Sequence, residues 1–176
     1  CSLADLERVV GADPALAARL MRVANSSFYG GLAEARTLRE GVMRLGLKGV
    51  ANLILAVGMK GVYKARKPCF QAALGRLWTA AVAGSVVSRE LARASLAASE
   101  EEAFLAGLVK DIGEGVILIT LDELAESDPR VARLPEDLLG KVLQGHHERL
   151  GADLLGRWGF PLAIVSAVGA HHAPPR

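Results

Sequence analysis

Apolar side chains recur at every third or fourth position along most of the chain, with polar residues between them. Leu16, Leu20 and Val23 have this spacing, which places all three on one face of a helix. The residues before them, Asp13-Pro14, supply an N-capping side chain and a proline at the first helical position. The pattern therefore predicts an all-α protein.

Turn residues divide this pattern into a series of helices. Thr37 and Glu40 have the spacing of a capping box, and Gly46 is expected to end the helix that they begin. Residues 116–121 are rich in β-branched side chains, but a single short strand would have no partner, so we predict helix there as well. The predicted helices lie at roughly residues 3–10, 14–24, 38–45, 48–60, 69–97, 99–111, 116–121, 135–142, 147–158 and 161–172.

Three local patterns refine the second half of this series. Ser99 and Glu102 are expected to cap the helix that ends near Asp111. Glycines 113 and 115 are then expected to interrupt the helical pattern. Asp128-Pro129 repeats the combination of a capping side chain and a proline.

The loop around Lys67-Pro68 indicates a boundary between two parts of the chain. We expect an N-terminal helical subdomain at residues 1–67, packed on a second helical subdomain at residues 68–176. Because the sequence begins with Cys1 rather than Met, we also expect it to be part of a longer protein.

Composition argues against several classes of partner. A net charge of +2 and an aromatic content of 5% do not favour a nucleic-acid-binding surface. The longest apolar stretch, at residues 50–59, is shorter than the roughly 20 residues that cross a bilayer, so no membrane partner is expected. Cys1 and Cys69 lack the spacing of a zinc site or a disulfide framework, which is typical of a protein in a reducing cytoplasm.

The four histidines are the main chemical signal, since all lie in the final third as His146-His147 and His171-His172. Imidazoles are common metal ligands, and a carboxylate such as Asp111 would complete a site if the fold brought these residues together. Adjacent residues on a helix point about 100° apart, so at most one histidine of each pair is expected to face a common centre. The alternative is that both pairs lie on the surface at helix ends. A GxSxG nucleophile motif and a phosphate-binding loop are absent from the sequence.

Several motifs occur in an order that resembles the HDOD family, bacterial output domains related to HD-type phosphohydrolases. Residues 13–20 and 24–30, DPALAARL and ANSSFYG, resemble the family's first signature. Residues 101–108, EEAFLAGL, and 147–152, HERLGA, resemble two later signatures, and His171-His172 fall on a terminal histidine pair. The resemblance covers nearly the whole chain and implies that residues 68–176 form an HD-like helical subdomain.

The resemblance also implies that the catalytic site is degenerate. HD hydrolases hold divalent metals with a His-Asp doublet, which here reads Lys110-Asp111, and an upstream ligand position falls near Ala80. A protonated lysine has no lone pair and repels a divalent ion. We therefore expect no metal and no cofactor, and a remnant pocket made of Lys110, Asp111, His147, His171 and His172. Lys110 either neutralises Asp111 or points to solvent and pairs with Glu114.

The resulting hypothesis is a non-catalytic, cytoplasmic signal-transduction or scaffold domain. Its expected partners are other signalling proteins or domains, and the family implies cyclic-dinucleotide signalling as a context. Asn25, Ser26 and Ser27 are either an interaction loop or simply a helix C-cap and turn. Two alternatives stay open: a metal-dependent phosphohydrolase with an altered site, and a pocket at Lys110 and the histidines that binds a nucleotide or anion without hydrolysing it.

Overall fold

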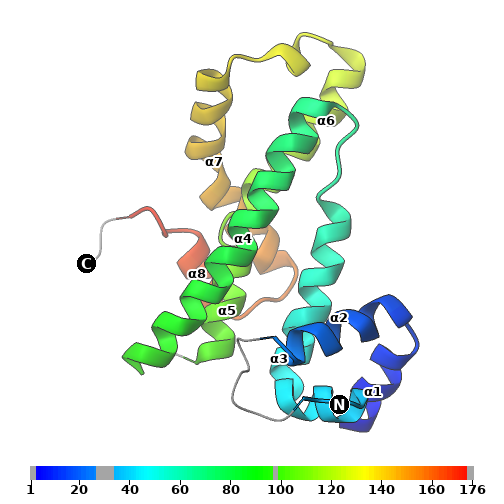
Figure 1. The fold of residues 1–176 in the computed structure, drawn as a ribbon. Coiled ribbons are helices and arrows are strands. Elements are labelled where there is room, and N and C mark those ends of the chain that lie inside the picture. The colour runs from blue at the N-terminus through cyan, green and yellow to red at the C-terminus, as the bar shows by residue number, and fades with distance from the viewer. Residues whose placement is uncertain (1–2, 27–33, 97–98, 174–176) are drawn as a thin grey trace. The chain divides into compact units, whose positions relative to one another are not determined.

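A computed structural model describes residues 3–26, 34–96 and 99–173 (Figure 1). Over these residues the regular structure is helical throughout, and the predicted all-α class is confirmed. The chain forms two compact units, Cys1–Met59 and Lys60–Arg176. The boundary expected after residue 67 lies inside the second unit, in the segment between helices α3 and α4, so the division at that residue stays a prediction.

The first unit contains α1 (Leu3–Gly11), α2 (Pro14–Ala24) and most of α3 (Leu38–Val62). Its core is aliphatic, because the apolar faces of these helices bury their side chains against one another. The fully or nearly fully buried members are Leu6, Val10, Leu16, Leu20, Ala24, Val42, Leu45 and Val50.

The helix starts predicted in this unit are confirmed by their hydrogen bonds. The Asp13 carboxylate accepts from the backbone N–H groups of Ala15 and Leu16 at 2.8 and 3.1 Å. Thr37 and Glu40 form the reciprocal bonds of a capping box, at 3.2 and 3.3 Å. Gly46 has φ 69° and ψ 175°, which breaks the helical path inside α3 where the sequence predicted a helix end.

Asn25 acts as the C-cap of α2 and fastens the segment that follows. Its side-chain amide donates to the carbonyl of Ala35 and accepts from the N–H of the same residue, both at 2.8 Å. The Ser26 hydroxyl donates to the Val23 carbonyl at 2.7 Å. These contacts match the capping interpretation, whereas the interaction role stays a prediction and Ser27 lies outside the described residues.

The second unit continues from the end of α3 into five α-helices and one 3-10 turn. Helix α4 is the longest, and it contacts both α5 and α6, while α7 packs on α6 and α8 (Figure 1). The bounds are α4 (Pro68–Ser95), α5 (Glu100–Val109), α6 (Ile112–Ser127), η2 (Val131–Arg133), α7 (Glu136–Arg157) and α8 (Leu162–Val168).

Glycines allow two pairs of these helices to approach closely. A methyl group at Gly107 of α5 would lie 2.8 Å from the carbonyl oxygen of Gly84 in α4. A methyl group at Gly113 of α6 would lie only 2.0 Å from the carbonyl oxygen of His147 in α7. The second contact matters most, because it brings the start of α6 against the part of α7 that carries His147.

The structure corrects four predictions in the second half. Glycines 113 and 115 do not interrupt a helix but lie within α6, where close packing rather than a turn requires a small residue. Helix α7 is continuous where two helices were expected. Ser99 begins α5 without a side-chain capping bond. Asp128 ends α6, and a short 3-10 turn follows it instead of an α-helix.

One segment, Leu38–Lys60, is long and apolar enough to cross a membrane by length and composition alone. The backbone break at Gly46 divides this segment into two shorter helical runs. Each run by itself is shorter than the roughly 20 residues that a span requires.

Candidate functional site

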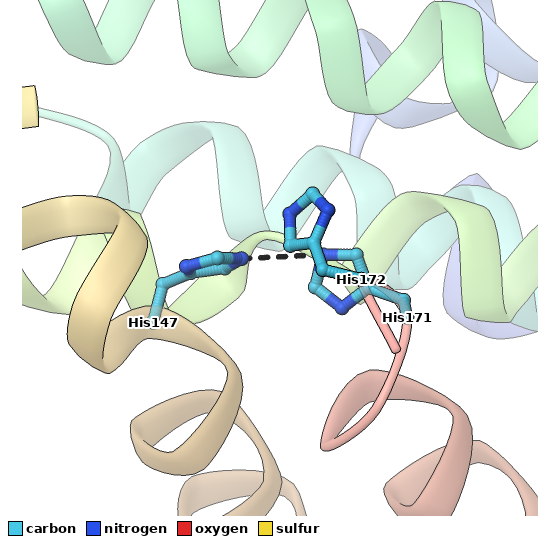
Figure 2. Close-up of side chains that lie close together, drawn as sticks. All are labelled: His147, His171 and His172. Carbon is cyan, nitrogen blue, oxygen red and sulfur yellow. Dashed lines mark hydrogen bonds between the residues drawn. The ribbon is translucent and has the colours of Figure 1, made fainter. Parts of the chain in front are cut away.

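The second unit brings Asp111, His147 and the pair His171-His172 together from three places in the chain. Figure 2 shows the three histidines of this group. Asp111 is the N-cap residue of α6, at its junction with α5. His147 is buried in α7, and the histidine pair lies in the turn that follows α8. From the sequence we expected Asp111 to lie at the end of the preceding helix, where a negative charge opposes the helix dipole. Its actual place at a helix start is electrostatically favourable.

Short distances connect these groups. Nε2 of His171 lies 3.2 Å from Nε2 of His147 and 3.2 Å from Oδ1 of Asp111. The other ring nitrogens face backbone carbonyls: Nδ1 of His147 is 2.8 Å from the oxygen of Leu143, and Nδ1 of His171 is 2.9 Å from that of Val168. His147 is therefore held by the preceding turn of its own helix, α7, and His171 is held by the last turn of α8.

These contacts place electron-rich atoms opposite one another at the centre of the site. A ring nitrogen that faces a carbonyl carries its proton there, so the Nε2 atoms of neutral His147 and His171 both present lone pairs. Nε2 of His171 then faces the lone pair of His147 and the carboxylate oxygen Oδ1 of Asp111, each at 3.2 Å. A cation between these groups would make the arrangement attractive.

Lys110 supplies one positive charge from the neighbouring position. Its ammonium group contacts Oδ2 of Asp111, the oxygen that does not face His171. The lysine stem lies close to Gly84 of α4, where an added methyl would be 3.7 Å from Cε. Of the two orientations that the sequence left open, the structure has the one in which Lys110 pairs with Asp111.

Two further residues belong to this site, and the sequence did not single them out in this role. Glu114 lies beside Asp111 and His147, and burial raises its pKa, an effect to which the Asp111 carboxylate adds. Burial, with the charges of Asp111 and Glu114, raises the pKa of Tyr63 to about 12, so its hydroxyl is protonated at neutral pH. Glu114 stands one helical turn after Asp111, and that spacing was the available signal.

One of the two histidine pairs differs from what helical geometry predicted. His147 is buried and His146 exposed, as expected for adjacent residues in a helix. In contrast, the rings of both His171 and His172 lie near His147, with centroids 5.0 and 5.1 Å from it, because a turn rather than a helix carries them.

Glu148 of α7 fixes this turn. Its carboxylate accepts from the backbone N–H of His172 at 2.8 Å, a bond that lowers the pKa of Glu148. The same oxygen lies 3.6 Å from Nδ1 of His171. Glu148 therefore ties the terminal histidines to the helix that carries His147.

The donor atoms can be compared with the needs of the divalent metal that HD-type sites hold. Nitrogen donors about 2.1 Å from an ion lie roughly 3 to 3.4 Å apart, which matches the two 3.2 Å separations. The residues thus fit a single ion held by imidazole nitrogens and Oδ1 of Asp111. They do not fit an ion that also needs Oδ2, because the Lys110 ammonium contacts that oxygen. Ala80, near which the upstream ligand position was expected, is exposed on α4.

Comparison with known proteins agrees with this architecture. A protein of unknown character from Treponema pallidum (strain Nichols) is 27% identical over 98% of the chain, which spans 34% of that relative. A provisionally named metal-dependent phosphohydrolase from Shewanella amazonensis SB2B is 22% identical, with a TM-score of 0.77 over 96% of this chain and 60% of that one. An HDOD domain protein of unknown function from Geobacter sulfurreducens is 21% identical, with a TM-score of 0.74 over 100% of this chain and 61% of that one.

At these identities the two solved structures show a shared fold. The stronger finding comes from the sequence, since the pattern that defines the HDOD domain matches residues 1–174. The chain therefore belongs to the HDOD domain family.

Proposed function

We propose that this chain is a non-catalytic regulatory domain, which acts by binding other signalling proteins or a small ligand. The observation that carries the proposal is the ion pair between Lys110 and Asp111. By the resemblance of the sequence to the HDOD family, this pair occupies the position at which HD-type hydrolases have the His-Asp doublet that binds their metal.

Electrostatics explains why this pair disfavours a catalytic ion. Two unit charges 4 Å apart interact by about 4 kcal/mol at an effective dielectric constant near 20, and a divalent ion doubles this repulsion from an ammonium group. Lys110 is partly exposed, so solvent reduces the value. The repulsion still competes directly with the attraction that a single carboxylate offers to the metal.

A turnover assay tests the proposal. The purified chain is incubated with bis(p-nitrophenyl) phosphate and Mn²⁺, next to Asp111→Ala as the matched control. We expect equal background rates, because the Lys110 ammonium repels the ion in the parent chain and Asp111→Ala lacks the carboxylate that would help to hold it. Hydrolysis that stops with a chelator and falls in Asp111→Ala would contradict the proposal.

The second candidate, a metal-dependent phosphohydrolase with an altered site, is favoured by one observation. The lone pairs of His147 and His171 point at each other across 3.2 Å, a spacing typical of two ligands on one ion. In this case a metal would polarise a phosphoryl oxygen or acidify a water molecule when bound. The same assay distinguishes the candidates, because the hydrolase predicts chelator-sensitive turnover.

A further inference from the structure

A cavity of about 390 Å³ lies in the second unit, beside the start of α4. Its volume is in the range of small-molecule sites. The residues around it come from the end of α3, the segment after it and the first turns of α4: Lys60, Tyr63, Lys64, Ala65, Gln71, Leu74, Gly75 and Trp78. The histidines and Asp111 are not among them, although Tyr63 also borders the site at Asp111.

Two aromatic rings form one wall of this cavity. Tyr63 and Trp78 pack with their centroids 5.8 Å apart and their planes at 59°. Tyr63 is nearly buried and rests on Gly115 of α6, where a methyl group would lie 3.3 Å from its ring. The wall is therefore fixed before any ligand arrives, which lowers the entropic cost of stacking a flat ring on Trp78.

The polar side chains around the cavity offer hydrogen-bond donors and positive charge. Lys60 and Lys64 both line it, and none of the described lining residues is acidic. Over the described part of the chain, neither lysine has a carboxylate within ion-pair distance. Gln71 accepts from the Ala65 N–H through Oε1 at 3.0 Å, which leaves its NH₂ group as a further donor.

The neighbouring cavity provides a contrast. It shares Lys64 and Ala65 but is also lined by Asp122, Glu123 and Glu126. There the basic side chain of Arg66 pairs with Glu126 at 3.6 Å. Its charges are mixed and partly neutralised, so it lacks the one-sided positive character of the cavity at Trp78.

We propose that the cavity at Trp78 binds a small anion that carries a planar aromatic ring, of the size of a nucleoside monophosphate. The ring stacks on Trp78, and the phosphate lies between Lys60 and Lys64. This site does not depend on the proposed function, since the groups that would bind the ligand, Trp78, Lys60 and Lys64, are not among the residues of the site at Asp111.

Fluorescence of Trp78 tests the proposal with AMP as the probe. The chain has two tryptophans, so Trp158→Phe leaves Trp78 as the only tryptophan, which is excited selectively over the two tyrosines. EDTA is present throughout, so that a metal at the histidines contributes nothing. AMP is expected to change the emission of Trp78 saturably, and adenosine and inorganic phosphate are expected to bind at least about tenfold more weakly, because each makes half of the contacts.

Gly75 offers a substitution that fills the cavity without disturbing the core. A Cβ at Gly75 meets nothing within 4 Å, and leucine is a better helix former than glycine. We expect Gly75→Leu to weaken AMP binding at least about tenfold. The matched control is Gly140→Leu in α7, where an added Cβ also meets nothing within 4 Å, and which should bind AMP as before.

The phosphate contact is tested by replacing both lysines with glutamine. This double variant should lose AMP affinity about tenfold while its weak adenosine binding is unchanged. Absence of a saturable signal at millimolar AMP, or unaltered binding by Gly75→Leu, would overturn the proposal. Loss of AMP binding in Lys110→Ala would also overturn it, because the anion would then lie in the pocket at Asp111.

Discussion

The contact between Lys110 and Asp111 joins two residues that are neighbours in the sequence. Inside a helix such neighbours do not face each other. Here the two residues form the junction between α5 and α6, where Asp111 has φ −103° and ψ 18°, and this geometry lets the ammonium reach Oδ2. The sequence predicted the residues of the site, but their contact depends on a helix boundary that periodicity locates only approximately.

Asp122 illustrates a residue whose role the sequence did not reveal. It is buried in α6, yet its carboxylate accepts from the backbone N–H groups of Arg66 and Lys67, both at 2.8 Å, just before α4 begins. Burial acts to raise the pKa of Asp122, but these two hydrogen bonds outweigh it and lower the pKa below the ordinary value of 3.8. The contact joins residues more than 50 positions apart, so sequence spacing carries no signal for it.

Asp122→Asn is expected to lower the free energy of unfolding by about 2 kcal/mol at neutral pH, since a charged acceptor of two hydrogen bonds is lost. A carboxyl group whose pKa is lowered by folding stabilises the protein fully above its unfolded pKa, and the effect disappears as the pH falls through the folded pKa. Urea unfolding of both proteins from pH 7 to pH 2 measures this. The two stabilities should converge at the acid end; a constant difference over the whole range would contradict the assignment.

Glu148→Ala is expected to release the turn that carries the terminal histidines. The Glu148 carboxylate holds the His172 N–H at 2.8 Å, and alanine removes this acceptor. We predict faster hydrogen exchange at the His172 amide, by about tenfold, with little change in the amides of the α6 core. Glu148→Gln retains an acceptor oxygen and should keep most of the protection, whereas equal exchange in all three proteins would be evidence against the role.

At the scale of the elements, the helix starts in the first unit could be predicted well from the sequence. Asp13-Pro14 and the box of Thr37 and Glu40 act through bonds between residues two or three positions apart, which the sequence displays directly. The errors lie in the second unit, and the clearest of them involves glycine. Gly113 and Gly115 were expected to break a helix, because intrinsic propensity does not include the neighbouring helix that needs the space.

Gly113→Ala tests the close approach of α6 and α7. A methyl group there would lie 2.0 Å from the carbonyl oxygen of His147, and backbone atoms cannot move aside without shifting α7. We expect a loss of about 3 kcal/mol in the free energy of unfolding, at the upper end of overpacking costs. Calorimetric or denaturant unfolding measures the change.

Gly145→Ala in α7 is the matched control for this substitution, because an added methyl meets nothing within 4 Å there. It should raise the stability by up to about 1 kcal/mol, as expected for alanine in a helix interior. If both variants had the same stability as the parent chain, the packing account of Gly113 would be wrong.

At the scale of the whole molecule, we expect the described helices to fold without a metal, because their cores are apolar. The residues buried in the second unit are mainly aliphatic, for example Leu74, Leu108, Leu118 and Leu155. The charges at the site are already partly compensated by Lys110. We therefore predict that EDTA leaves the Tm of the purified chain unchanged; a drop of several degrees would indicate a structural metal.

Binding of Mn²⁺ tests the central claim most directly, since this ion prefers carboxylate oxygens and depends on Asp111 more than an imidazole-preferring ion does. Calorimetric titration compares the parent chain, Lys110→Ala and Lys110→His. We predict no saturable binding by the parent chain, and binding at least about tenfold tighter by Lys110→His, which restores a ligand and removes the repelling charge, than by Lys110→Ala. Tight, stoichiometric Mn²⁺ binding by the parent chain, equal to that of Lys110→His, would contradict the claim that Lys110 has taken the place of the metal.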